Sequence, residues 1–177
     1  MKSLTLLRHA KAGWGEPSQR DFDRPLDERG RRAAPRMGLY LRTEGLRFDR
    51  VVVSPSVRTL ETLALVEEGY GAKFTEMEDE RVYLASADSL INLIHDLPDE
   101  WDSVMFIGHN PGLEDLGRKL AGSGPERLMT LLDAFLPTAA VMELTFDVDR
   151  WSDVEEGEGV LVRFTRPVDL NAALDGD

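Results

Sequence analysis

Hydrophobic residues along the chain form short continuous runs, which alternate with stretches where apolar residues recur every three or four positions. The three most apolar runs are Leu4–Leu7, Val51–Val53 and Val104–Ile107. Continuous runs of this kind are typical of parallel strands that are covered on both faces. The pattern predicts an α/β fold with about six strands, over Ser3–Leu7, Arg50–Val53, Lys73–Met77, Ser103–Ile107, Val141–Phe146 and Val160–Phe164.

Helical periodicity fills most of the segments between these runs. Leu90, Leu93 and Ile94, for example, fall on one side of a helical projection. Ser54 and Asn110 are each followed by proline, a combination typical of a helix start. We therefore expect five helices, over Arg29–Thr43, Pro55–Val66, Ser86–Leu97, Pro111–Leu120 and Glu126–Phe135.

Three segments lack a clear periodic pattern. Residues 10–28 form a long loop after the first strand, and we regard this loop as a candidate lid. The last two strands alternate in hydrophobicity and are predicted to form an antiparallel pair, joined by an exposed acidic connection over Asp147–Gly159. Residues 168–177 are expected to form a flexible tail.

The composition is that of one globular domain, which we expect to span residues 1–177. Hydrophobic residues make up 42% of the chain and charged residues 31%. No apolar run reaches the ~18 residues needed to span a membrane, and the N-terminal segment is too short in apolar residues for a signal peptide. Cysteine is absent, which excludes disulfides, thiolate metal sites and thiol nucleophiles, and a cytoplasmic location is expected.

The chain is strongly acidic, with a formal net charge of −12. A charge of this sign repels nucleic acids and anionic membranes at long range, so neither is an expected partner. A phosphorylated substrate would therefore need a local cationic pocket. The main role assigned to the acidity is solubility.

Cationic and titratable side chains follow three of the predicted strands. Arg8 and His9 end the first run, Arg58 lies just after the second, and His109 lies just after the fourth. Ligands of α/β sheets bind beyond the carboxyl ends of parallel strands, so these four side chains are expected to meet at one edge. Each residue taken alone has a simpler structural explanation, but the joint pattern favours phosphate chemistry.

The residue types fit that chemistry. Arginine pairs bidentately with phosphate oxygens and stays charged at any working pH. Neutral imidazole is a nucleophile that can accept a phosphoryl group, and nearby arginines favour the neutral form of His9. Fixed cations around the transferred group lower the barrier by stabilising charge on its oxygens, which removes the need for a metal ion.

Three motifs resemble, in the same order, those of the histidine phosphatase (phosphoglycerate mutase-like) superfamily. Within it, the likeness is to short bacterial phosphohistidine phosphatases of the SixA type. Further similarity lies in a segment after the first motif, in a Pro-Thr pair before a strand and in a late tryptophan. The matching segments are Leu7-Arg8-His9-Ala10, Asp23-Arg24-Pro25-Leu26 with Gly30, Val53-Ser54-Pro55-Ser56-Val57-Arg58-Thr59, Ile107-Gly108-His109-Asn110-Pro111, Pro137-Thr138 and Trp151.

The resemblance implies a three-layer α/β/α sandwich over a mixed, mostly parallel sheet, with no metal or other cofactor. It implies that His9 is the nucleophile that becomes phosphohistidine and that Arg8, Arg58 and His109 form the phosphate pocket. Lys11, two residues past His9, is either a further phosphate contact or a solvated lysine. The implied function is a phosphatase whose substrate is phosphohistidine on a protein.

Glu80 is the candidate general acid, because it lies after a strand at a position similar to the acid of the mutase branch. Little chain separates that strand from the next helix, so few residues can form a roof over the site. An ester leaving group needs a proton donor, whereas an imidazole leaving group is readily protonated. An open site with a poorly placed acid therefore favours phosphohistidine.

Other functions fit the sequence too. A phosphatase of small phosphoesters, such as sugar or nucleotide phosphates, is the main alternative. A mutase fits less well, because it must retain its intermediate under a closed cover. A non-catalytic phosphoprotein-binding module would not need all four of these residues. The sequence does not predict the oligomeric state.

Overall fold

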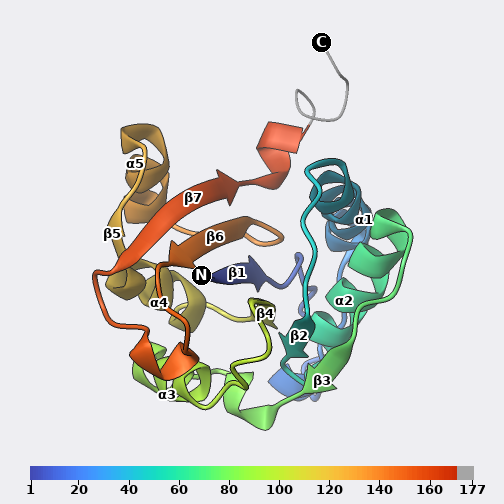
Figure 1. The fold of residues 1–177 in the computed structure, drawn as a ribbon. Helices are drawn as coiled ribbons and strands as arrows, with labels where there is room; N and C mark the ends of the chain where they lie inside the picture. Colours follow the sequence, from blue (N-terminus) through green and yellow to red (C-terminus); the bar gives the residue numbers. More distant parts are fainter. Residues whose placement is uncertain (171–177) are drawn as a thin grey trace.

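The computed structural model describes residues 1–170, which form a seven-stranded mixed sheet with helices on both faces (Figure 1). The strand order is β3-β2-β4-β1-β6-β7-β5, and the first four of these strands are parallel neighbours. β6 is antiparallel to both β1 and β7. The strands are β1 Lys2–Arg8, β2 Arg50–Val53, β3 Glu76–Glu78, β4 Ser103–Gly108, β5 Ala121–Ser123, β6 Val141–Phe146 and β7 Gly159–Thr165.

The sheet separates two hydrophobic cores, because successive residues of a strand point to opposite faces. Leu6 belongs to the core under α3, α4 and α5, and Leu7 belongs to the core under α1 and α2. This is the expected three-layer α/β/α sandwich. The helices are α1 Glu28–Thr43, α2 Val57–Tyr70, α3 Ala87–His95, α4 Gly112–Leu120 and α5 Glu126–Ala134, and the 3-10 turns are η1 Asp21–Asp23, η2 Glu80–Val82, η3 Trp151–Asp153 and η4 Pro167–Asp169.

The sheet has one strand more than the six expected. The additional strand, β5, consists of Ala121, Gly122 and Ser123, which show no strand-like hydrophobic pattern, and it pairs with β7 at the edge of the sheet. The third expected strand lies later, at Glu76–Glu78 instead of Lys73–Met77. β3 and β5 are short strands at the two edges of the sheet. Few of their side chains are buried, so their sequences show no clear hydrophobic pattern.

The start of α2 also differs from the prediction. Ser54 was expected to cap a helix that begins at Pro55, but the helix begins at Val57. Ser56 occupies the N-cap position, and its hydroxyl lies 2.6 Å from that of Thr59. The Ser54 hydroxyl lies 2.8 Å from Nε2 of the His109 ring. Ser54 therefore contacts a site residue at the end of β4 instead of capping a helix.

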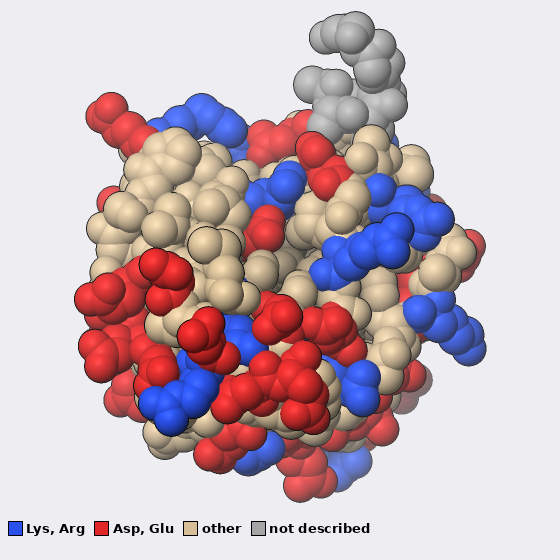
Figure 2. Space-filling view, in the orientation of Figure 1, with Lys and Arg blue, Asp and Glu red and all other residues tan. Residues whose placement is uncertain are grey.

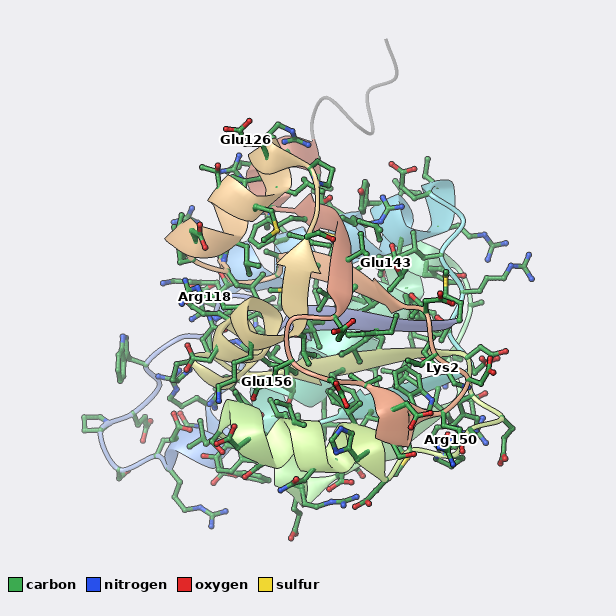
Figure 3. All side chains as sticks on the ribbon, turned by 60° about the vertical axis from the view of Figure 1, so that its left-hand side comes forward. Lys2, Arg118, Glu126, Glu143, Arg150 and Glu156 are labelled. Atoms are coloured by element: carbon green, nitrogen blue, oxygen red, sulfur yellow. The ribbon has the colours of Figure 1, made fainter. Side chains whose placement is uncertain are left out.

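The connection between β6 and β7 was expected to be exposed, but part of it is buried. Trp151 is fully buried in it, and its indole N–H donates to the Trp101 carbonyl over 2.6 Å. The ammonium group of Lys2, at the start of β1, lies 5.7 Å from the Trp151 ring and donates to the Asp99 carbonyl over 2.5 Å (Figure 3). This turn therefore closes the amino end of the sheet.

The first residues of the expected tail are folded. Residues 167–169 form η4, and Leu170 is fully buried against the core under α1 and α2. Residues 171–177 of the expected tail lie outside the described residues. No helix within residues 1–170 is long and apolar enough to cross a membrane.

Helices α1 and α2 pack very closely, through two glycines. A Cβ atom on Gly38 of α1 would collide with the Val66 carbonyl oxygen of α2, and one on Gly69 of α2 would collide with the Pro35 carbonyl of α1. The contact is between backbones, so no side-chain rotation can relieve it. It positions α2, which holds Arg58 at its first turn.

We expect Gly38→Ala and Gly69→Ala each to destabilise the protein by roughly 1–3 kcal/mol, the usual cost of overpacking. Alanine would otherwise stabilise a helix relative to glycine, so the sign of the change tests the backbone contact. Urea denaturation measures it. Gly13→Ala, where the added Cβ would meet an ordinary 3.7 Å contact, is the control. A gain in stability in either helix variant would contradict the close packing.

Candidate active site

The three sequence motifs meet because β2, β4 and β1 are parallel neighbours whose carboxyl ends are level. The His9 N–H donates to the Gly108 carbonyl over 3.0 Å, and the Ser54 N–H donates to the Ile107 carbonyl over 3.1 Å. These bonds extend the sheet by one residue beyond each strand. The site therefore lies at the carboxyl ends of these central strands. In Figure 1 this end of the sheet faces away from the viewer, opposite the N-terminus.

The tautomer of His9 follows from its hydrogen bond. Its Nδ1 lies 2.7 Å from the Ala10 carbonyl oxygen, which can only accept, so Nδ1 holds the proton and Nε2 holds the lone pair. The side chain is only 8% exposed. Burial lowers its pKa to about 4, with the charges of Arg58, Arg8 and Arg24 adding to the shift and the Ala10 hydrogen bond opposing it. His9 is therefore a neutral base at neutral pH.

Arg58 is held by an acidic residue of the loop after β1. Its Nη1 donates to the Asp21 carbonyl over 2.7 Å, and its Nη2 donates to Asp21 Oδ2 over 3.0 Å. The Tyr83 hydroxyl donates to the same carboxylate oxygen over 2.7 Å. Partial burial opposes ionisation of Asp21, but the hydrogen bonds from Tyr83 and Arg58 outweigh it and lower the pKa.

His109 lies between the other residues, with its ring centroid 5.3 Å from that of His9. Its Nδ1 accepts from Arg58 Nη2 over 3.3 Å, because a guanidinium can only donate. Its Nε2 therefore holds the proton and donates to Ser54 Oγ over 2.8 Å. Burial, together with the nearby His9 and Arg58, lowers the pKa of His109 to about 3. Both ring nitrogens have protein partners here, so His109 orients Arg58.

Arg8 is positioned by the segment before β6. Its Nη1 donates to the Leu136 carbonyl over 3.0 Å, and the Asn110 side-chain amide donates to the same oxygen over 2.8 Å. Burial lowers the pKa of Arg8, and the carboxylate of Glu114 opposes that shift. An arginine remains charged under such a shift, so Arg8 is a fixed cation beside His9.

Three arginines around His9 have a buried Nε–H group that makes no hydrogen bond in the described residues: Arg8, Arg24 and Arg58. The Arg24 Nε is ion-paired with Asp21 Oδ1 over 3.6 Å, so the Nε groups of Arg8 and Arg58 are the two without an acceptor in residues 1–170. A buried donor without an acceptor costs roughly 1–3 kcal/mol, and two of them beside one imidazole would be a poor solution for stability alone. The arrangement suits an anion with several oxygen acceptors, such as a phosphoryl group.

Glu80 and Lys11 are placed differently from the four central residues. Glu80 lies in η2, between the end of β3 and the start of α3, and its side chain is exposed. Lys11 is also exposed and lines a hollow beside α1 that Arg29 and Thr138 share. No hydrogen bond or ion pair within residues 1–170 joins either side chain to His9.

The sequence did not single out Asp21 and Tyr83, which belong to the site. Asp21 lies in the aperiodic loop, and Tyr83 follows the edge strand β3, so neither stands at a marked strand end. Arg24 had appeared only within the segment Asp23-Arg24-Pro25-Leu26, with no role of its own, and its guanidinium lies 4.7 Å from the ring of the exposed Trp14. Contacts between distant segments join all three to the site: Asp21 bonds Arg58, and Tyr83 and Arg24 both contact Asp21.

Within the described residues 1–170, no group of three or more His, Asp or Glu side chains is arranged to hold a metal ion. The positive charge at the site comes from guanidinium groups.

Comparison with known proteins identifies the family. Residues 4–81 match the model of the histidine phosphatase superfamily (branch 1). An uncharacterised protein of Mycobacterium tuberculosis is 31% identical over 163 residues, which cover 91% of this chain and 99% of the relative. One of Mycobacterium leprae is 30% identical over 165 residues, which cover 91% of this chain and 99% of that relative.

Solved structures agree with this assignment. A protein named as the phosphohistidine phosphatase SixA from Agrobacterium tumefaciens matches with a TM-score of 0.77 and 27% identity, over 94% of this chain and 98% of that one. A protein named in the same way from Nakamurella multipartitia also has a TM-score of 0.77 and 27% identity, over 94% and 96% of the two chains. The chain therefore belongs to the histidine phosphatase superfamily and resembles its SixA-type members.

Proposed function

We propose that this protein is a metal-independent phosphatase that works through a phospho-His9 intermediate and takes its phosphoryl group from phosphohistidine on a protein. The observation that supports it best is the neutral, Nδ1-protonated His9 beside the buried Nε groups of Arg8 and Arg58, which have no partner within residues 1–170, with Arg24 as a third nearby cation. We place the activity in the cytoplasm on sequence features alone, chiefly the absence of cysteine.

In the proposed first step, the His9 Nε2 lone pair forms a bond to phosphorus as the P–N bond of the substrate breaks. Arg8 and Arg58, with Arg24 as a third cation, stabilise the charge on the phosphoryl oxygens. In the second step, water attacks phosphorus, the bond to His9 breaks, phosphate departs and a proton passes to solvent. His9 regains its lone pair without changing its Nδ1 hydrogen bond.

The short cover over the site supports phosphohistidine as the substrate, with imidazole as the leaving group. β3 ends at Glu78 and α3 begins at Ala87, so only a short loop with η2 lies between them. The free ring nitrogen of phosphohistidine can take a proton near neutral pH, so the ring leaves phosphorus as neutral imidazole. The bridging oxygen of a sugar phosphate is too weakly basic to be protonated in this way, so its departure would depend on a proton from an acid such as Glu80, which is exposed here.

A trapped phosphoenzyme tests the nucleophile. Brief mixing with a labelled phosphoryl donor and quenching in alkali should leave label on the wild-type protein, because phosphohistidine is stable to base and labile to acid. His9→Ala should retain no label. His95→Ala is the matched control, since His95 bonds the Val154 carbonyl away from the site, and it should label normally. Label on His9→Ala would remove His9 as the nucleophile.

A substrate panel tests the leaving group. We expect kcat/KM for a phosphohistidine peptide to exceed that for sugar and nucleotide monophosphates by at least about tenfold. Glu80→Gln should change phosphohistidine turnover by less than about threefold, whereas a general acid typically contributes about 10²–10⁴-fold. The reverse order, with a large effect of Glu80→Gln on esters, would favour the phosphoester phosphatase.

The pH dependence of stability tests the neutral histidines. The pKa of His9 is about 4 in the folded protein, below its ordinary value of 6.5. Between these values the unfolded chain binds more protons than the folded one, so the free energy of unfolding falls as the pH falls. From pH 7 to pH 5, His9 should account for a loss of roughly 2 kcal/mol.

Urea denaturation of the wild type and of His9→Gln at both pH values isolates this contribution, because the carboxylates common to both proteins cancel in the difference. The variant should lose less stability than the wild type by about that amount. Equal losses in the two proteins would show that His9 titrates normally in the folded state.

A further inference from the structure

Two adjoining hollows lie along the exposed side of α1. One is lined by Arg29, Arg32, Arg36, Pro167 and Val168, among others, and the second is lined by Lys11, Arg29, Ala33, Thr138 and Pro167. They share Arg29, Ala33 and Pro167, so they form one continuous surface depression between α1 and η4. We call it the α1 groove. Figure 1 shows α1 and the η4 turn side by side.

All the charged side chains that line the α1 groove are cationic: Lys11, Arg29, Arg32 and Arg36. This is unusual in a chain with 33 acidic and 21 basic residues. The face shown in Figure 2, on the amino side of the sheet, is instead acidic over its lower half, around α3 and η3. The groove is therefore a positively charged region on a protein whose net charge is negative.

The groove has cations that a partner can engage. Lys11, Arg29 and Arg32 are all exposed. Arg32 pairs with Glu28 over 3.0 Å, but the two side chains are 66% and 83% exposed, and exposed pairs contribute only about 0–1 kcal/mol. The Val168 side chain, 74% exposed, adds an apolar contact surface.

One end of the groove reaches the candidate active site. Lys11 lies two residues after His9, and Thr138 precedes Ala139, whose N–H donates to the carbonyls of Arg8 and His9 over 3.1 Å. From there the groove follows α1. Arg29 and Arg36 are seven residues apart, about 10 Å along a helix, which is the length of roughly three extended residues.

We propose that the α1 groove binds an acidic segment that flanks the phosphohistidine of the protein substrate. This inference rests on the proposed phosphohistidine activity and adds a determinant of which phosphoproteins are accepted. The occupant is an acidic peptide segment because the groove is cationic throughout and open to solvent, and because it begins beside the residue that takes the phosphoryl group. On the acidic face around α3 and η3, such a segment would meet like charge.

Two phosphohistidine peptides of equal length test the groove, one with four aspartates after the phosphohistidine and one with four serines. Wild-type protein should show a KM at least about tenfold lower for the aspartate peptide, with similar kcat. Arg29→Glu/Arg32→Glu should abolish this preference and should leave turnover of free phosphohistidine within about twofold of the wild type. That last measurement shows that the variant is folded and that its site is intact.

The matched control is Arg47→Glu/Arg150→Glu, which changes the net charge equally at exposed positions near the amino ends of the parallel strands. Arg47 precedes β2 and its carbonyl accepts from Ser103 at the start of β4, and Arg150 precedes η3. The control should keep the preference for the aspartate peptide. If it loses the preference as the groove variant does, the effect comes from net charge and the groove inference is overturned.

The remaining outcomes separate the two proposals. No turnover of free phosphohistidine by the wild type would overturn the proposed function. Normal turnover with equal KM for the two peptides would overturn the groove alone. A change in oligomeric state in Arg29→Glu/Arg32→Glu, measured by sedimentation, would assign the groove to a second copy of the chain and would also overturn the inference.

Discussion

The parallel pairing of β2, β4 and β1 is the constraint on which the rest of the site depends. Because the three strands end level, the residues that follow them arrive within reach of one another without any long connection. His9 and Ser54 even continue the hydrogen-bonded ladder past the strands. The backbone of His9, the proposed nucleophile, is therefore part of the sheet, and its imidazole lies in the site. A rigid backbone of this kind holds a nucleophile in reacting geometry at little cost in entropy on substrate binding.

The charges at the carboxyl ends of these strands satisfy two requirements that usually conflict. A phosphate pocket needs positive charge, and a nucleophilic histidine needs to be neutral. Burial and the nearby arginines lower the pKa values of His9 and His109 to about 4 and about 3, so the cations proposed to bind the phosphoryl group also keep both imidazoles uncharged. Asp21 links the loop after β1 to this cluster through Arg58 and Tyr83, so part of the candidate lid is hydrogen-bonded to a proposed phosphate-binding arginine.

The outer parts of the molecule suit a macromolecular substrate. The cover over the site is short, and a cationic groove leads away from it along α1 in an otherwise acidic chain. A small phosphate ester would use only the pocket around His9, whereas a phosphoprotein could use both regions. α1 lines the groove, and α2 holds Arg58 of the pocket. The close backbone packing of these two helices therefore fixes the position of the groove relative to the pocket.

The amino-acid sequence by itself determined the α/β class, the central parallel strands and the four residues Arg8, His9, Arg58 and His109, because strand burial and strand-end chemistry are local and leave a continuous pattern. It did not determine the edge strand β5, the true start of α2 or the burial of Trp151, because these depend on what packs against them. Asp21, Tyr83 and Arg24 join the site only through contacts between loops that are distant in sequence. The protonation states of the histidines were likewise decided by the tertiary structure, since burial and the hydrogen-bond partner of each ring nitrogen exist only once the chain has folded.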